Sequence, residues 1–137
     1  MRSITFENLP SKPIPSTLRD FSAPITLIQD ISSDELNVLG RYDTNLFNRW
    51  NALRILSFQA IENFIYNGVA IPDYLLSSIY EVICSDELSY AYRTRVVTPP
   101  SPQNILSYLV SQNRTVDPLK ISKAITNFEK VLSKKCA

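Results

Sequence analysis

The stretch that decides the fold is residues 43–68, DTNLFNRWNALRILSFQAIENFIYNG. Its apolar side chains recur at helical spacing, and because each residue of a helix turns by about 100°, they share one broad face. Asn67-Gly68 ends the pattern, since Asn and Gly tolerate the left-handed conformation that closes many helices. We therefore predict a long amphipathic helix from about Asp43 to Tyr66. Its apolar face comprises Leu46, Phe47, Trp50, Leu53, Phe58, Ala60, Ile61, Phe64 and Ile65.

Helix-start signals lie on both sides of this stretch. Upstream, Ser32 followed by Glu35 has the pattern of a capping box, and apolar residues follow at helical spacing. Downstream, serine, aspartate and proline stand where the first turns of four more helices are expected. These starts are Ile71-Pro72-Asp73, Ser85-Asp86-Glu87 (ending near Arg93), Ser101-Pro102, and Asp117-Pro118 (ending near Lys134). The sequence thus predicts a mainly α fold, an antiparallel helical-hairpin array of about six helices.

The N-terminal part has a different character. Four of the nine prolines fall within the first 24 residues, and proline disfavours helix in and just before its position. The β-branched runs Ile4-Thr5-Phe6 and Ile25-Thr26-Leu27-Ile28 favour short strands. Two or three strands cannot enclose a core. We therefore expect a short extended or β segment over residues 1–30, followed by a helical domain over residues 31–137.

The composition excludes most routes to catalysis. The chain has 137 residues, no histidine, two glycines and two cysteines. Without histidine there is no His-dependent triad, no Cys-His dyad and no zinc site that needs imidazole. Two isolated glycines cannot form a glycine-rich phosphate loop. We therefore predict no catalytic, cofactor-binding or metal-binding residues, and no enzymatic activity of this chain alone.

The charge and hydropathy of the sequence limit the kinds of partner and the cellular location that are expected of the protein. The net charge is +1, and no apolar run is long enough to span a bilayer or to act as a signal peptide. Two cysteines fit a reducing compartment, so a cytoplasmic location without membrane contact is expected. The last predicted helix gathers its lysines on one side and apolar residues on the other. A solvated lysine face is the favoured interpretation over nucleic-acid binding, since no aromatic residue interleaves the lysines. The lysines are Lys120, Lys123, Lys130 and Lys134.

Three further residues each allow two interpretations. Trp50 lies within the apolar arc of the long helix, which favours core packing over an exposed anchor for a partner. Arg54 lies in the same arc, and we expect it to pair with a carboxylate or with helix C-terminal carbonyls. Cys84 follows Ile83 on an apolar helix face and is expected to be a small buried residue.

Several motifs resemble a known family. The runs Phe6-Glu7-Asn8-Leu9 and Pro13-Ile14-Pro15-Ser16-Thr17-Leu18-Arg19-Asp20-Phe21-Ser22-Ala23-Pro24-Ile25 look like a junction in bacterial-type aminopeptidase N, within the M1-family zinc metallopeptidases. Asp43-Thr44-Asn45-Leu46-Phe47-Asn48-Arg49-Trp50-Asn51-Ala52 is similar to the family's Asp-x-Phe-x-Arg-Trp-acidic-Ala helix, with Asn51 in place of the acidic residue. Pro99-Pro100-Ser101 and Val116-Asp117-Pro118 resemble later helix starts.

The resemblance implies the end of a β-sandwich domain followed by the first part of a C-terminal helical domain. Family members are several times longer and hold zinc through a His-Glu-x-x-His motif and a further glutamate, none of which this chain contains. In the family, the helical domain caps the active-site chamber and restricts entry to peptides. The expected role is therefore non-catalytic scaffolding and substrate gating, with the other domains of the aminopeptidase as partners.

Two hypotheses from different classes follow. The first is a non-catalytic piece of a zinc aminopeptidase. The second is an independent helical module that binds protein or, through the lysine face, nucleic acid. A truncated helical array would also leave apolar surface uncovered, so we expect self-association through the last helix or the N-terminal strands. The residues expected to remain exposed on that helix are Ile121, Ile125, Phe128 and Leu132.

Overall fold

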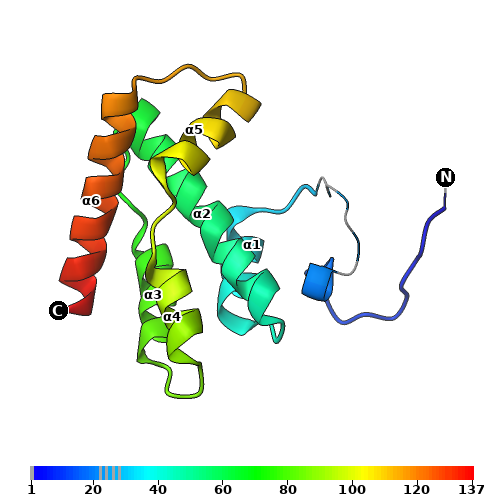
Figure 1. Ribbon diagram of the computed structural model, residues 1–137. Helices are drawn as coiled ribbons and strands as arrows, with labels where there is room; N and C mark the ends of the chain where they lie inside the picture. Colours follow the sequence, from blue (N-terminus) through cyan, green and yellow to red (C-terminus); the bar gives the residue numbers. More distant parts are fainter. Residues whose placement is uncertain (1, 22, 24, 26, 28) are drawn as a thin grey trace.

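The computed structural model describes residues 2–21, 23, 25, 27 and 29–137. Six α-helices follow a short 3-10 turn, η1, at Arg19–Phe21, and no strand occurs among the described residues. The predicted mainly α fold is confirmed (Figure 1). The helices are α1 (Ser33–Tyr42), α2 (Leu46–Asn67), α3 (Asp73–Cys84), α4 (Tyr90–Val97), α5 (Pro102–Ser111) and α6 (Pro118–Cys136).

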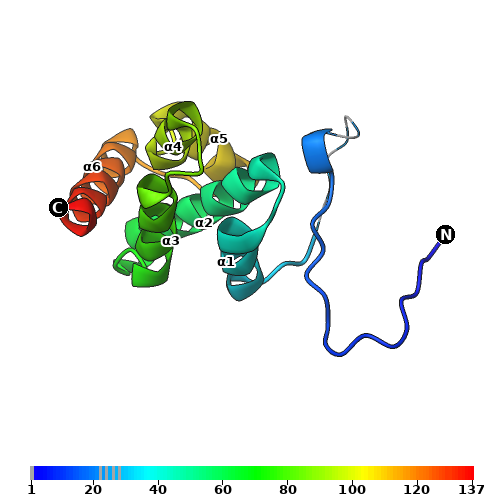
Figure 2. The ribbon, with the colours of Figure 1, turned by 90° about the horizontal axis from the view of Figure 1, so that it is seen from below.

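The long helix α2 is the centre of the array. It contacts η1 and all five other helices, and consecutive helices pack as the pairs α1–α2, α3–α4 and α5–α6. Further contacts of α3 with α1 and α6 close the assembly. Figure 2 shows the same helices as one packed group from which the N-terminal segment extends away. The predicted helical-hairpin array is therefore confirmed.

Burial of α2 extends beyond the predicted face. Leu53, Phe58, Ala60 and Ile61 are buried as expected, whereas Leu46 is exposed at the first turn. The remaining predicted residues, Phe47, Trp50, Phe64 and Ile65, are half-buried. Helices cover α2 from several sides, and this explains why residues outside the predicted arc are buried as well. These additional residues are Ala52, Leu56 and Ser57.

A glycine permits the close approach of α1 to α2. A Cβ atom added at Gly40 would lie 2.7 Å from Leu53 Cδ2 and 2.9 Å from Leu53 Cγ, so no side chain fits without displacement. Arg49 Nε donates a hydrogen bond of 2.9 Å to the Gly40 carbonyl oxygen, across the same contact. Gly68 ends α2 with φ 64, the left-handed conformation predicted from Asn67-Gly68.

Most helix starts agree with the predicted caps, and one does not. Ser32, Ser101 and Asp117 are the N-caps of α1, α5 and α6, and Ser32 forms the full capping box with Glu35. The predicted fourth helix is present, but its predicted bounds, Ser85 to about Arg93, are wrong, because Ser85 is the C-cap of α3 and α4 spans Tyr90–Val97. Residues 86–88 form a turn, and Ser89 caps α4 instead.

The N-terminal segment is extended but forms no strand in its described part. Ile4 and Phe6 are exposed, as are Ile25 and Leu27, and none has a strand partner. The two predicted strands are therefore wrong over these residues, because alternating β-branched residues form a strand only beside another strand. Thr26 and Ile28, also in the second run, lie outside the described residues.

A polar network holds residues 16–20 against the start of α2. Asp43 accepts hydrogen bonds from the Ser16 hydroxyl at 2.6 Å and from the Asn45 backbone N–H at 2.8 Å. The Asn48 amide donates to the Ser16 hydroxyl and to the Thr17 carbonyl oxygen, at 3.0 and 2.7 Å. Asn45, which is buried, caps α2 and also donates to Asp20 at 2.7 Å.

Two expectations about the helix surfaces need correction. The apolar face of α6 is covered, because Ile121, Phe128 and Leu132 are buried and Ile125 is half-buried. The last helix therefore does not leave that face open for self-association. Cys84 is exposed rather than buried, since it lies in the last turn of α3. None of the helices in the described part of the chain has the length and apolar content needed to cross a bilayer.

Candidate functional site

The candidate site is built on one stripe of α2. Five large side chains follow each other at intervals of four residues, and because residues four apart lie on the same face of a helix, they form a continuous row. The row alternates aromatic and charged groups. Its members are Trp50, Arg54, Phe58, Glu62 and Tyr66.

At the N-terminal end of the row, two guanidinium groups share one indole ring. The guanidinium carbon of Arg95, from α4, lies 4.7 Å from the Trp50 ring centroid, and that of Arg54 lies 5.5 Å from it. Arg54 also lies 4.9 Å from the Phe58 ring centroid. Arginine over an aromatic face is attractive because the ring carries negative charge on its faces.

At the C-terminal end of the row, the charged groups are paired. Tyr108, from α5, stacks on Phe58 with ring centroids 5.0 Å apart and donates its hydroxyl to Glu62 at 3.1 Å. Arg114 pairs with Glu62 at 3.0 Å and lies 4.7 Å from the Tyr66 ring centroid. Burial, followed by the nearby Glu62 charge, raises the pKa of Tyr108 to about 12. This end is therefore a closed structural cluster.

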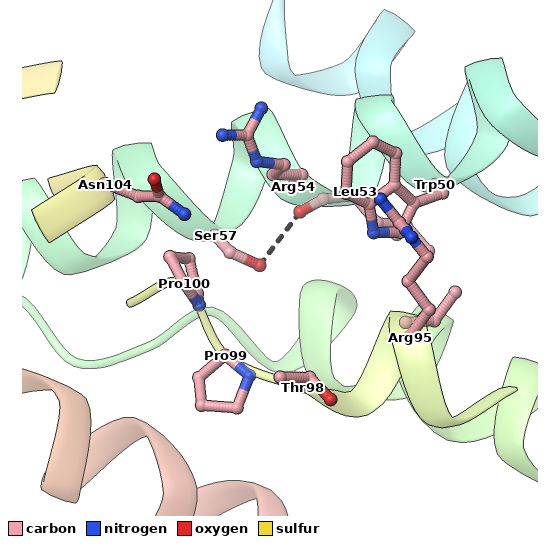
Figure 3. A pocket seen from close by; sticks show the side chains of 10 residues that line it. Trp50, Leu53, Arg54, Ser57, Arg95, Thr98, Pro99, Pro100 and Asn104 are labelled. Carbon is pink, nitrogen blue, oxygen red and sulfur yellow. Dashed lines mark hydrogen bonds between the residues drawn. The ribbon is translucent and has the colours of Figure 1, made fainter. Parts of the chain in front are cut away.

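The N-terminal end opens into a hollow of about 240 Å³ between α2, α4 and the link to α5. Figure 3 shows the Arg95 side chain reaching the Trp50 ring from α4, and Pro99 and Pro100 on the link that follows α4. The Arg54 side chain extends from α2 and points away from the two prolines. The Ser57 hydroxyl in this hollow donates to the Leu53 carbonyl oxygen at 2.9 Å. The wall thus combines apolar and polar residues. The polar residues are Arg54, Ser57, Arg95, Thr98 and Asn104.

A second, larger hollow adjoins the same residues. It has a volume of about 790 Å³ and lies between α2 and the N-terminal segment, with Leu18, Ile25 and Phe47 among its apolar lining residues. Trp50, Arg54 and Arg95 line both hollows. The three residues therefore form the boundary between two concave surfaces.

These positions revise two predictions. Trp50 is half-buried and packs against the core, but it also lines both hollows, so the core interpretation describes only part of its surroundings. Arg54 contacts neither a carboxylate nor a helix-terminal carbonyl among the described residues, and it stacks on two aromatic rings instead. Sequence reasoning missed Arg95, which α4 supplies. The repeat of large side chains every four residues along α2 was the signal that could have indicated the row.

The lysine face of α6 is exposed, which fits both the solvated and the nucleic-acid-binding interpretations. Its four lysines are all exposed and lie opposite the buried residues of the helix. A neighbouring lysine outside this face, Lys135, pairs with Asp73 at 2.9 Å.

The donor set does not fit a zinc ion. The chain has no imidazole, and the described residues bring together no group of three or more Cys, Asp or Glu side chains suited to hold a metal. Zinc sites in proteins use three or four such ligands.

The known proteins to which this chain is similar are aminopeptidases. The chain is 28% identical to aminopeptidase N of Caulobacter vibrioides over 108 residues, which is 75% of this chain and 12% of that protein. It is 27% identical to aminopeptidase N of Haemophilus influenzae over 124 residues, 87% of this chain and 14% of that protein. The chain thus spans about one-seventh or less of the length of these relatives.

A solved structure gives the same result. The crystal structure of Legionella pneumophila aminopeptidase A in complex with aspartic acid matches with a TM-score of 0.77 and 26% identity, over 95% of this chain and 15% of that one. These matches confirm the resemblance to the C-terminal region of M1-type aminopeptidases. A family model described as a domain of unknown function with ARM repeats (DUF3458_C) matches residues 33–137. Since this match covers most of the chain, including all six helices, the chain belongs to that family of ARM-repeat domains.

Proposed function

We propose that this chain is a non-catalytic helical domain of a zinc-dependent, M1-family aminopeptidase, in which it supports the catalytic part and limits access of peptides to it. The parent enzyme removes N-terminal amino acids from peptides, and the chain works with its remaining domains in the cytoplasm. Residues 31–137 would form the helical domain, and residues 1–30 the connection to the preceding domain.

One observation carries the proposal. Nearly the whole chain aligns with a small part of much longer aminopeptidases, 75–87% of this chain against 12–14% of the two relatives. A segment of that size in an enzyme of that length acts together with other domains. The chain has no histidine, so the chemistry of a zinc aminopeptidase would come from another part of the parent.

A chimeric enzyme tests the supporting and gating role. In aminopeptidase N of Haemophilus influenzae, the segment that this chain matches is replaced by this chain, and a deletion variant of the same enzyme lacks the segment altogether. We expect the chimera to cleave aminoacyl nitroanilides and short peptides while discriminating against the N-terminus of a folded protein. The deletion variant should lose this discrimination or the fold of the enzyme.

The isolated chain provides the control for the non-catalytic part of the proposal. It should show no aminopeptidase turnover and retain no stoichiometric zinc after washing with a chelator. Turnover in proportion to this chain, or a chimera that folds but selects substrates no differently from the deletion variant, would contradict the proposal. An upstream reading frame that encodes His-Glu-x-x-His would support it independently.

A further inference from the structure

We infer that Trp50, Arg54 and Arg95 form a binding site for the carboxylate of a short peptide. The first argument is that the two guanidinium groups lack an oxygen partner. Among the described residues, neither donates a hydrogen bond to an oxygen or lies within ion-pair distance of a carboxylate. Five of the other six arginines do have such a partner. These are Arg19, Arg41, Arg49, Arg93 and Arg114.

The second argument is the placement of the two charges. Both guanidinium carbons lie near one indole ring, at 4.7 and 5.5 Å from its centroid, and both residues line the same two hollows, so a short peptide bound there can contact both. Two guanidinium groups without an oxygen partner make this surface positive, and an anion bound there would accept hydrogen bonds from their free donors. The ring fixes the orientation of both groups before the ligand arrives, which lowers the entropy cost of binding.

The third argument is the chemistry of the surrounding surface. Guanidinium presents a planar fork of donors that matches a carboxylate through two parallel hydrogen bonds. Asn104 adds a side-chain amide, while Val96, Pro99 and Pro100 offer apolar contact for a peptide side chain. The larger hollow, of about 790 Å³, lies within the size range of small-molecule sites, and the smaller one, of about 240 Å³, adjoins it.

The choice of a peptide rests on the proposed function, because peptides with a free C-terminal carboxylate are the substrates and products of an aminopeptidase. The carboxylate chemistry itself does not depend on it. A binding measurement on the isolated chain requires no catalytic domain, so its outcome and that of the chimera experiment are independent of each other.

The chain carries its own probe, since Trp50 is its single tryptophan. Trialanine is titrated into the full chain while tryptophan fluorescence is recorded, in parallel with trialanine amide and with inorganic phosphate. We expect a saturable change with trialanine, and binding at least tenfold weaker for the amide, which lacks the negative charge. Raising the salt concentration should weaken trialanine binding.

Arg95→Met is the main variant, because Arg95 is exposed on α4 and its loss leaves the core intact. It should weaken trialanine binding about tenfold or more, and Arg54→Met should do the same. Arg114→Met is the matched control, since Arg114 also stacks on an aromatic ring but is already paired with Glu62. This control should bind trialanine like the unmodified chain.

Several outcomes would overturn the inference. They are equal binding of trialanine and its amide, tighter binding of phosphate than of trialanine, and absence of a fluorescence change at millimolar peptide. Unchanged binding in Arg95→Met, with helicity by circular dichroism equal to that of the unmodified chain, would overturn it as well.

Discussion

The contact between Gly40 and Leu53 determines how closely α1 approaches α2. Gly40→Ala places a methyl group 2.7 Å from Leu53 Cδ2 and should destabilise the fold by about 1–2 kcal/mol, because overpacking outweighs the better helix propensity of alanine. In a Leu53→Ala background the same substitution should cost nothing or stabilise the protein, since the clashing atoms are gone. Urea denaturation of the four proteins gives this coupling energy, and strictly additive effects would contradict the proposed contact.

Trp50 and Phe128 differ in how far the fold depends on them. Phe128 is 1% exposed, and Phe128→Ala should cost about 3–5 kcal/mol. Trp50 is only half-buried and borders two hollows, so Trp50→Ala should cost less, about 1–3 kcal/mol. Chemical denaturation followed by circular dichroism measures both. If Trp50→Ala were the more damaging of the two, Trp50 would be a core residue and not the wall of a binding site.

Because of Tyr108, the stability of the fold should depend on pH in the alkaline range. Burial and the Glu62 charge raise the pKa of Tyr108 to about 12, above the usual value of about 10 for an unfolded chain. The folded state therefore holds this proton more tightly. The stability that this raised pKa of Tyr108 contributes is fully present below about pH 10 and is lost as the pH rises through about 12. In Tyr108→Phe, stability should fall less steeply over this range.

Glu62→Gln separates the two causes of the shift. It removes the charge but keeps an oxygen acceptor for the Tyr108 hydroxyl, so the pKa of Tyr108 should decrease while burial still holds it above about 10. Spectrophotometric titration of the phenolate, with Tyr108→Phe as reference, measures the pKa. An unchanged pKa in Glu62→Gln would show that burial alone causes the shift.

Part of the candidate site was readable from the sequence at the residue scale. The spacing of Trp50, Arg54 and Phe58 places them on one face of a helix, and the helix itself was predicted. The partner of Arg54 was not predictable, because cation–π stacking within the helix competes with pairing to a distant carboxylate. Arg95 was not predictable either, since α4 meets α2 only through the tertiary packing.

At the scale of the helix, the start of α4 offers a direct test of capping. Ser89 accepts a hydrogen bond from the Tyr92 backbone N–H at 3.2 Å, whereas Ser85 lies at the end of α3. Ser89→Ala should destabilise the fold by about 1 kcal/mol, and Ser85→Ala by at most a few tenths. Thermal denaturation of both variants compares them directly. Equal losses would mean that the cap of Ser89 contributes no stability of its own.

The same region shows why helix boundaries were harder to predict than helices. Ser85-Asp86-Glu87 and Ser89 both offer a serine before a helical run, and local sequence does not choose between them. The chain uses residues 86–88 to turn between α3 and α4. Where only one start signal exists, as at Ser101 and Asp117, prediction and structure agree. The prediction of two N-terminal strands was wrong for a related reason. A strand needs a partner strand, and the described N-terminal residues do not provide one.

At the scale of the whole molecule, the N-terminal segment is held to the helices by polar contacts and is not packed into their core. Residues 2–12 are exposed, and the polar network around Asp43 and Asn48 holds residues 16–20 to α2. The helices from α1 to α6 bury one continuous core without help from residues 2–12. The matched family model begins at residue 33, close to the start of α1, which is consistent with this division of the chain.

Self-association remains a prediction of the whole molecule, but the structure changes the surface that would cause it. The apolar face of α6 is buried, whereas Leu106 and Val110, one turn apart on α5, are 41% and 61% exposed. Uncovered apolar side chains at the edge of a helical array favour contact with a second copy. Light scattering over a concentration series should therefore show an increasing average mass for the unmodified chain.

The double variant Leu106→Glu with Val110→Glu should remain monomeric, because two carboxylates oppose burial. Val38→Glu, at a 40% exposed position on α1, is the control and should associate like the unmodified chain. A constant monomer mass for the unmodified chain at every concentration would show that α5 needs no cover.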